Sequence, residues 1–234
     1  MKRILAVVPA RGGSKGIKLK NLREVAGKTL VGWAGTTLKQ ISMVDRKIIS
    51  TDHHEISMEA ERNGLSVPFM RPEDLSGDFI SDLQVLHHAL TASEKFFNET
   101  FDVVVMLQPT SPARTVTHIE EVITKLVDDD LDAVWTVSPT DLKYHPLKQL
   151  SIGEDGLMDF YLEGGKAVIA RQQLKPVYHR NGICYAFTRD CLLKQETIKG
   201  KRTGAVVIEG RIPNIDTVED LAFAEEVISK MELS

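Results

Sequence analysis

A glycine-rich, cationic segment near the start of the chain has the residue types that bind phosphate groups. Residues 9–21 read PARGGSKGIKLKN, and three glycines in this segment would let backbone N–H groups approach an anion closely. Side-chain donors come from four cations and two neutral polar residues: Arg11, Lys15, Lys18, Lys20, Ser14 and Asn21. A triphosphate needs both backbone and side-chain donors, so the segment predicts a polyphosphate site; a solvated basic loop is the alternative.

Two well-known phosphate-binding patterns are excluded. Gly27, Lys28 and Thr29 resemble the end of a P-loop, but the glycine required five residues before Gly27 is replaced by Leu22. The G-x-G-x-x-G pattern of dinucleotide-binding proteins is also missing, because Ser14 and Ile17 occupy two of its glycine positions. The sequence therefore favours neither a P-loop NTPase nor a nicotinamide-dependent enzyme.

Asp216 is the strongest candidate for a metal ligand. A nucleoside triphosphate usually brings Mg²⁺, which proteins hold with one or two carboxylates in addition to phosphate oxygens. Asp216 follows an expected strand and precedes the last expected helix. A residue in that place can equally be a helix N-cap, and the two roles are compatible.

A second polar segment, residues 107–114 with the sequence LQPTSPAR, follows another expected strand. Gln108 has an amide that can hydrogen-bond a sugar, and Arg114 has a guanidinium that can meet an anion. The alternative is a rigid, proline-rich turn before a helix.

The elements that must position these residues are alternating strands and helices. Four short apolar runs, at 4–8, 47–50, 103–107 and 133–137, have the continuous Val- and Ile-rich character of parallel strands buried on both faces. The segments between them carry apolar residues at helical spacing. This order predicts an α/β fold with a doubly wound, mostly parallel sheet, whose ligands bind beyond the carboxyl ends of the strands.

The pattern changes after Pro139. Prolines, glycines and short apolar stretches up to residue 203 predict hairpins and a short helix inserted into the sheet domain. A strand at 206–208 and a helix at 216–231 follow. We therefore expect an α/β domain formed by residues 1–139 and 204–234, and an inserted subdomain formed by residues 140–203.

Composition excludes several classes of protein. The 29 Lys and Arg residues against 33 Asp and Glu residues leave a net charge of −4, so general nucleic-acid binding is not expected. No apolar run reaches the ~20 residues that a membrane span needs. Cys184 and Cys191 are the only cysteines, too few for a disulfide scaffold, and they indicate reduced thiols in a cytoplasmic protein.

These features together resemble the acylneuraminate cytidylyltransferase family, which includes the CMP-sialic acid synthetases. The most specific part of the resemblance is residues 10–22, ARGGSKGIKLKNL. Weaker matches follow in the family's order along nearly the whole chain: residues 50–52, 71–72, 107–112, 144–148, 171–173, 181–182 with 185, and 215–217.

The resemblance implies a Rossmann-like nucleotidyltransferase fold in which the insertion forms a homodimer. It implies Mg²⁺-dependent transfer of CMP from CTP to the anomeric hydroxyl of a nine-carbon 2-keto sugar acid, with release of pyrophosphate. The residues expected to hold CTP are Arg11, Gly12, Ser14, Lys15, Lys20, Asn21, Arg71 and Ser81, of which Arg11, Lys15 and Lys20 would be catalytic. The residues expected to bind the sugar are Gln108, Arg171, Asn181 and Tyr185, with Lys148 reaching the partner's site. Asp216 would bind the metal together with residue 214.

Two departures from the family pattern limit these expectations. Asn214 stands where many members have a second metal-binding aspartate, and its carbonyl oxygen supplies less charge. Residues 196–199 lack the aromatic pair that lines the sugar pocket in some members, so N-acetylneuraminate, KDN and a legionaminate-like acid all stay open as acceptors. The alternatives are a nucleotidyltransferase for another acceptor and a non-catalytic, nucleotide-binding regulator.

Overall fold

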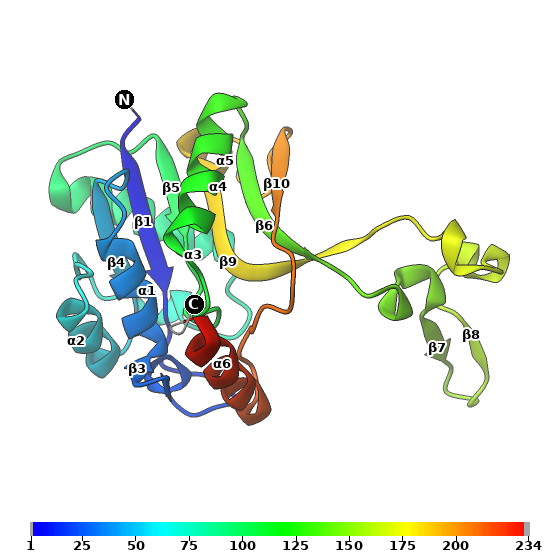
Figure 1. The fold of residues 1–234 in the computed structure, drawn as a ribbon. Helices are drawn as coiled ribbons and strands as arrows, with labels where there is room; N and C mark the ends of the chain where they lie inside the picture. Colours follow the sequence, from blue (N-terminus) through cyan, green and yellow to red (C-terminus); the bar gives the residue numbers. More distant parts are fainter. Residues whose placement is uncertain (1, 232–234) are drawn as a thin grey trace. The chain divides into compact units, whose positions relative to one another are not determined.

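The computed structural model describes residues 2–231 and contains a six-stranded sheet (Figure 1). The strand order is β10-β6-β9-β5-β1-β4. The strands are β1 (Ile4–Pro9), β4 (Arg46–Ser50), β5 (Val103–Met106), β6 (Ala133–Pro139), β9 (Tyr178–Thr188) and β10 (Thr203–Val207). Strand β1 pairs in parallel with both β4 and β5, whereas β9 pairs antiparallel with β5. The predicted α/β fold with a mostly parallel sheet is confirmed.

Six α-helices accompany the sheet in the described part of the chain: α1 (Leu30–Lys39), α2 (His54–Arg62), α3 (Asp82–Phe97), α4 (Val116–Asp128), α5 (Arg189–Leu193) and α6 (Val218–Met231). Ser81 caps α3 and Thr115 caps α4, each in a reciprocal capping box. The last helix begins two residues later than predicted, and the strand expected at 206–208 lies at Thr203–Val207.

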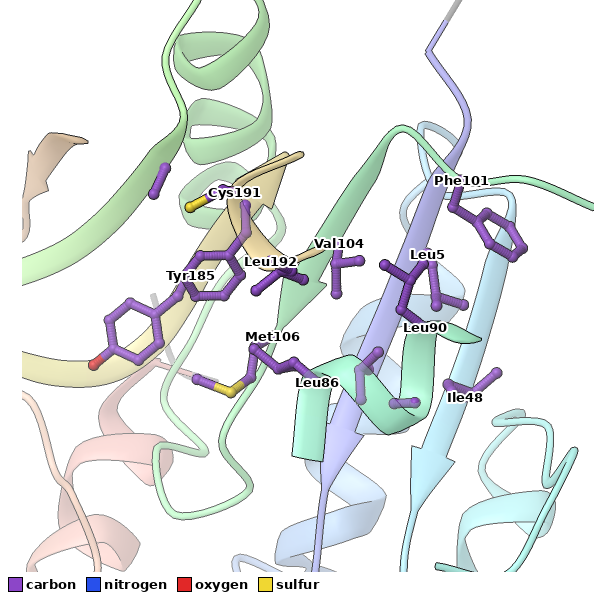
Figure 2. Packing of buried hydrophobic residues seen from close by; sticks show 14 residues of the cluster. Leu5, Ile48, Leu86, Leu90, Phe101, Val104, Met106, Tyr185, Cys191 and Leu192 are labelled. Carbon is purple, nitrogen blue, oxygen red and sulfur yellow. The ribbon is translucent and has the colours of Figure 1, made fainter. Parts of the chain in front are cut away.

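The core explains why the short apolar runs form buried strands. Leu5 of β1 and Val104 of β5 are fully buried, and they pack with Leu86 and Leu90 of α3 (Figure 2). The neighbouring residues of the same strands are also buried. Since successive side chains point to opposite faces of a sheet, both faces of these strands are covered. Burial on both faces holds the carboxyl ends of β1, β4 and β5 at one edge.

The chain divides into two compact units. The first comprises residues 1–136, 181–206 and 211–234, and it contains most of the sheet and all six α-helices. It also contains the two-stranded ribbon of β2 (Glu24–Val25) and β3 (Lys28–Thr29), and the 3-10 helices η1 (Lys20–Leu22) and η2 (Glu73–Leu75).

The second unit comprises residues 137–180 and 207–210. It holds the antiparallel hairpin of β7 (Leu150–Ile152) and β8 (Met158–Phe160). Four short 3-10 helices complete it: η3 (Leu142–Tyr144), η4 (Pro146–Lys148), η5 (Glu163–Ala167) and η6 (Arg171–Gln173). The sequence pattern predicts an insertion that extends to residue 203. That boundary is too late, because the second half of β9 enters the sheet beside β5 and α5 packs against α3 in the first unit.

Candidate active site

The cationic segment leaves β1 at its carboxyl end and is fixed by the segment that follows β4. The backbone N–H of Gly12 donates a hydrogen bond of 2.8 Å to the Asp52 carboxylate. A Cβ at position 12 would lie 2.7 Å from Cδ2 of His53, so only glycine fits against that ring. At the other end, the Asn21 amide donates to the carbonyl oxygen of Arg11 at 2.9 Å, which draws the segment into a closed loop.

This loop forms one wall of a cavity of ≈450 Å³ at the carboxyl edge of the sheet. Three other segments line the cavity: the one between η2 and α3, the one after β5, and the one before α6. The lining residues are Pro9, Arg11, Ser14, Lys20, Asn21, Arg71, Leu75, Gly77, Asp78, Ile80, Asp82, Val85, Gln108, Pro109, Thr110, Asn214 and Asp216. The cavity thus joins the glycine-rich loop, the segment after β5 and the segment before α6, which were predicted separately, at the edge where ligands bind in open α/β sheets.

Two of the loop cations contact a carboxylate from the opposite wall. Arg11 Nη1 lies 2.8 Å from one oxygen of Asp78, and Lys15 Nζ lies 2.5 Å from the other. These two cations lower the pKa of the Asp78 carboxyl below its ordinary value, with Lys15 making the larger contribution. The Lys15 side chain is 77% exposed and does not line the cavity itself.

Lys20 links the loop to the segment before α6. Its ammonium donates to the carbonyl oxygen of Ile215 and to the Asp216 carboxylate, both at 2.9 Å. The backbones also meet here, because a Cβ at Gly16 would lie 2.6 Å from the carbonyl oxygen of Asp216. The predicted phosphate loop and the predicted metal ligand are therefore direct neighbours.

The Asp216 side chain does not cap α6, which is the alternative role that the sequence allows. The Thr217 hydroxyl accepts a hydrogen bond from the backbone N–H of Asp220. The Asp220 carboxylate in turn accepts from the backbone N–H groups of Asp216 and Thr217, which lowers its pKa. These two side chains occupy the start of α6 and leave the Asp216 carboxylate facing the cavity.

Arg71 and Ser81 were both expected near the nucleotide. Arg71 is buried at the cavity wall and donates to the carbonyl oxygen of Ser50 at 2.8 Å, while its Nε has no hydrogen-bond partner among residues 2–231. Burial lowers the pKa of its guanidinium. Ser81 caps α3 and its side chain does not line the cavity.

Gln108 and Asn214 form a further wall of the cavity. Both line the cavity, and Gly182 of β9 lies directly against them. A Cβ at position 182 would lie 2.8 Å from Oε1 of Gln108 and 3.6 Å from Oδ1 of Asn214. Arg114, which was predicted as an anion ligand, is instead buried behind this wall and donates to the carbonyl oxygens of Gln108, Gly182 and Ile183. Burial lowers the pKa of Arg114 to about 10.

Asn181 and Tyr185 do not line the cavity, although both were expected to face a sugar. Asn181 is buried, and its side-chain oxygen accepts hydrogen bonds from the Thr136 hydroxyl and the backbone N–H of Ile183. Tyr185 is part of the hydrophobic core (Figure 2). Its hydroxyl accepts from the backbone N–H of Gly182 at 2.7 Å. Both residues support the wall that carries Gln108.

The remaining expected sugar ligands belong to the second unit. Lys148 is the last residue of η4, and Arg171 begins η6 with a side chain that is largely exposed. The Arg171 guanidinium lies 3.9 Å from the Asp141 carboxylate within the same unit.

The donors at the cavity fit a metal bound mainly through phosphate. Residues 2–231 contain no group of three or more His, Cys, Asp or Glu side chains that could hold a metal by themselves. Asp216 and Asn214 nevertheless offer one carboxylate and one amide oxygen at the same cavity. Mg²⁺ in nucleotide sites needs only one or two protein oxygens of this kind, so the donor set is adequate when a polyphosphate is present.

Sequence reasoning missed the segment between η2 and α3. Gly77, Asp78 and Ile80 line the cavity, and Asp78 pairs with the two loop cations. The only available signal was an acidic residue shortly before the Ser81 cap, which a surface turn would also produce. The two thiols are free, as expected, and the structure shows in addition that both are buried. No α-helix within the described range is both long enough and apolar enough to cross a bilayer.

Comparison with known proteins assigns the chain to a family. A sequence profile described as cytidylyltransferase matches residues 5–232. A CMP-N,N'-diacetyllegionaminic acid synthase from Legionella pneumophila is 34% identical, over 97% of this chain and 96% of the relative. An N-acylneuraminate cytidylyltransferase from Streptococcus agalactiae is 30% identical over 92% of this chain, which corresponds to 51% of that longer protein.

The fold has a close structural counterpart as well. The structure of a CMP:2-keto-3-deoxy-manno-octonic acid synthetase complexed with CTP superposes with a TM-score of 0.73, covering 98% of this chain and 99% of the other at 15% identity. At that identity the likeness establishes the fold. The match of the family profile to almost the entire chain establishes more: this protein is a nucleotidyltransferase that belongs to the cytidylyltransferase family.

Proposed function

We propose that this chain transfers CMP from CTP to the anomeric hydroxyl of a nine-carbon 2-keto sugar acid and releases pyrophosphate. One observation carries the proposal. A single cavity is lined by the cations Arg11 and Lys20 of the glycine-rich loop, by Asp216, and by the uncharged wall of Gln108. In that arrangement the two cations can bind a polyphosphate, Asp216 can bind its metal, and Gln108 can hydrogen-bond a polyhydroxylated acceptor.

The chain contributes positioning and electrostatic stabilisation. Arg11, Lys15 and Lys20 would bind the triphosphate oxygens and offset the negative charge that builds on the departing pyrophosphate. The acceptor hydroxyl would attack the α-phosphorus in line with that leaving group. Mg²⁺, held by Asp216, Asn214 and phosphate oxygens, would supply further charge neutralisation.

The nucleotide and the acceptor would contact different walls of the cavity. Gly12, Ser14 and Asn21 would hold the nucleotide from the loop, with Arg71 close by, and Ser81 would act through the start of α3. Gln108 would hydrogen-bond the sugar. Asn181 and Tyr185 would act on the sugar indirectly, because their hydrogen bonds hold the backbone around Gly182 against Gln108.

The acceptor that we propose first is N,N'-diacetyllegionaminic acid. Support comes from the Legionella pneumophila relative and from a second relative, 30% identical, from Campylobacter jejuni; both are named as synthases of the CMP derivative of this acid. Other relatives are named for pseudaminic acid and N-acylneuraminate, so the acceptor class is nonulosonic acids.

We further propose a homodimer formed through the second unit. That unit exposes many large apolar side chains for its size: Tyr144, Leu150, Ile152, Leu157, Met158, Tyr161, Ile169 and Tyr178. Exposed apolar surface of this extent is typical of a protein–protein interface. Lys148 and Arg171 lie in the same unit and would meet the partner's acceptor, Arg171 through the sugar carboxylate. Sedimentation velocity should give a dimer that Ile152→Asp plus Leu157→Asp converts to a monomer; a monomeric wild type would overturn this part.

Product analysis tests the proposed reaction. Purified protein is incubated with Mg²⁺ and one nucleotide, which is CTP, UTP or ATP. The acceptor is N,N'-diacetyllegionaminic acid, pseudaminic acid, N-acetylneuraminic acid or KDN. Pyrophosphate and the sugar nucleotide are measured by coupled assay and mass spectrometry. We expect a CMP-sugar with at least one acid and the highest rate with N,N'-diacetyllegionaminic acid. Calorimetric binding of CTP without turnover for any acid would favour a non-catalytic regulator.

A further inference from the structure

Asp78 occupies the place in the cavity where a phosphate group is expected. Its two carboxylate oxygens contact different cations of the loop, Arg11 at 2.8 Å and Lys15 at 2.5 Å. A phosphate group bridging the same two side chains would use the same donors, because carboxylates and phosphates both accept charge-assisted hydrogen bonds from guanidinium and ammonium groups. The carboxylate of Asp78 and a bound polyphosphate therefore compete for Arg11 and Lys15.

The segment that carries Asp78 is weakly attached to the rest of the first unit. Within residues 2–231, the backbone N–H groups of Gly77, Asp78 and Phe79 donate no hydrogen bond to another backbone group. The turn is closed by a long hydrogen bond of 3.4 Å from the N–H of Ile80 to the carbonyl oxygen of Gly77. The Phe79 side chain, next to Asp78, is 99% exposed. Movement of residues 77–79 would break few contacts apart from the two ion pairs.

The electrostatics favour displacement when a polyphosphate arrives. Asp78 carries one negative charge and lines the cavity together with the carboxylates of Asp82 and Asp216. A triphosphate carries several charges at the same short distance from Arg11 and Lys15, so it binds these cations more strongly than Asp78 and repels its carboxylate.

We propose that Asp78 is an internal counter-anion that sets the affinity of the nucleotide site, holding Arg11 and Lys15 in the free enzyme and yielding them to the polyphosphate. The inference rests on the proposed function, because it requires that these two cations bind the triphosphate. When pyrophosphate leaves, Asp78 returns to the two cations and keeps the product from staying bound. The residue thereby weakens binding of every polyphosphate and prevents tight retention of pyrophosphate.

Direct binding measurements test the role of Asp78. Calorimetry without Mg²⁺ and acceptor gives the Kd of CTP and of inorganic tripolyphosphate for the wild type and for Asp78→Asn and Asp78→Ala. We expect both variants to bind both anions about three- to tenfold more tightly, which is the size expected from two partly exposed ion pairs. Pyrophosphate inhibition in the forward reaction should strengthen by a similar factor.

Two controls separate this role from a general effect of charge. Glu73→Gln removes one exposed negative charge from η2, close by in the chain, and should leave both Kd values unchanged. In a Lys15→Met background the gain from Asp78→Asn should shrink, because one of the two ion pairs is already absent. Circular dichroism and thermal melting verify that each variant is folded.

The outcomes distinguish this inference from the proposed function. Unchanged or weaker binding by folded Asp78 variants, with normal CTP binding by the wild type, overturns the counter-anion role alone and makes Asp78 a group that positions Arg11 and Lys15. A wild type that binds tripolyphosphate but not CTP contradicts the proposed function while the tripolyphosphate measurements still decide the role of Asp78. A wild type and variants that bind neither anion overturn both.

Discussion

The Lys20 ammonium and the Asp216 carboxylate lie 2.9 Å apart, although 196 positions separate the two residues in the chain. This ion pair joins the end of the glycine-rich loop to the segment before α6. The Lys20 side chain is only 15% exposed, and that of Asp216 is 73% exposed. Lys20 is therefore held in place by its surroundings, while the Asp216 carboxylate keeps an open side toward the cavity for a further cation.

Lys15→Ala should reduce kcat/KM for CTP by about 10²-fold, since a donor to charge that develops in the transition state is lost. The fold should persist, because the side chain is largely exposed. Steady-state kinetics and a thermal melt measure the two effects. Lys194→Ala is the matched control, since Lys194 is a similarly exposed lysine with one carboxylate partner, Asp190 on α5. Near-normal turnover in Lys15→Ala would remove Lys15 from the catalytic residues.

Asp216→Asn should raise the Mg²⁺ concentration needed for half-maximal activity or abolish the activity, because only amide oxygens then remain at positions 214 and 216. Metal-free binding of CTP should not weaken, since the substitution removes a negative charge and releases Lys20. A Mg²⁺ titration and calorimetry measure these quantities, with Asp190→Asn as the control. An unchanged Mg²⁺ titration would contradict the assignment of Asp216 as the metal ligand.

Gly182→Ala should destabilise the protein by ~1–3 kcal/mol and raise KM for the sugar acid more than KM for CTP. The residue has φ +76°, and an added Cβ would lie 2.5 Å from the Ser111 hydroxyl and 2.8 Å from Gln108 Oε1. Denaturant unfolding and kinetics with each substrate varied give both numbers. Equal increases in the two KM values would argue against an acceptor role for the Gln108 wall.

Acidification should destabilise the fold through His118. Burial lowers the pKa of this histidine from its ordinary 6.5, and its Nδ1 accepts a hydrogen bond from the backbone N–H of Thr115 in the cap of α4. Below pH 6.5 the unfolded chain takes up the proton first, so the free energy of unfolding falls until the pH also passes the lowered pKa of the folded state. Denaturant unfolding at pH 7 and pH 5 measures the loss.

Two substitutions isolate this effect. His118→Gln keeps an acceptor for the cap but cannot titrate, so its loss of stability between pH 7 and pH 5 should be smaller than that of the wild type. His87→Gln, at an exposed position on α3, should behave like the wild type. Identical pH dependence in His118→Gln and the wild type would show that other groups dominate.

The sequence predicted the parts of the site that follow from local patterns. Short apolar runs indicated β1, β4 and β5, and parallel strands place their carboxyl ends together, which brought residues 10–21 and Gln108 to one edge. The same rule predicts that Lys20 and Asp216 lie at the same edge of the sheet. It does not predict their ion pair, because the distance between the two side chains depends on how both segments fold.

Other features depend on tertiary packing that no local pattern encodes. The first half of β9 is polar and contains Gly182, so residues 178–188 gave no sign of an antiparallel strand inserted beside β5. Tyr185 was expected to face a ligand, but its place in the core follows from the register of that strand. The contacts of Asp78 likewise arise from the path of an irregular segment.

Amide hydrogen exchange with and without CTP and Mg²⁺ tests most directly whether the loop after β1 binds the polyphosphate. The account predicts that CTP slows exchange in residues 10–21 and around Asp216, and that cytidine alone, which lacks phosphates, leaves residues 10–21 unchanged. Equal effects of cytidine and CTP on this loop, or CTP protection confined to other segments, would contradict the account.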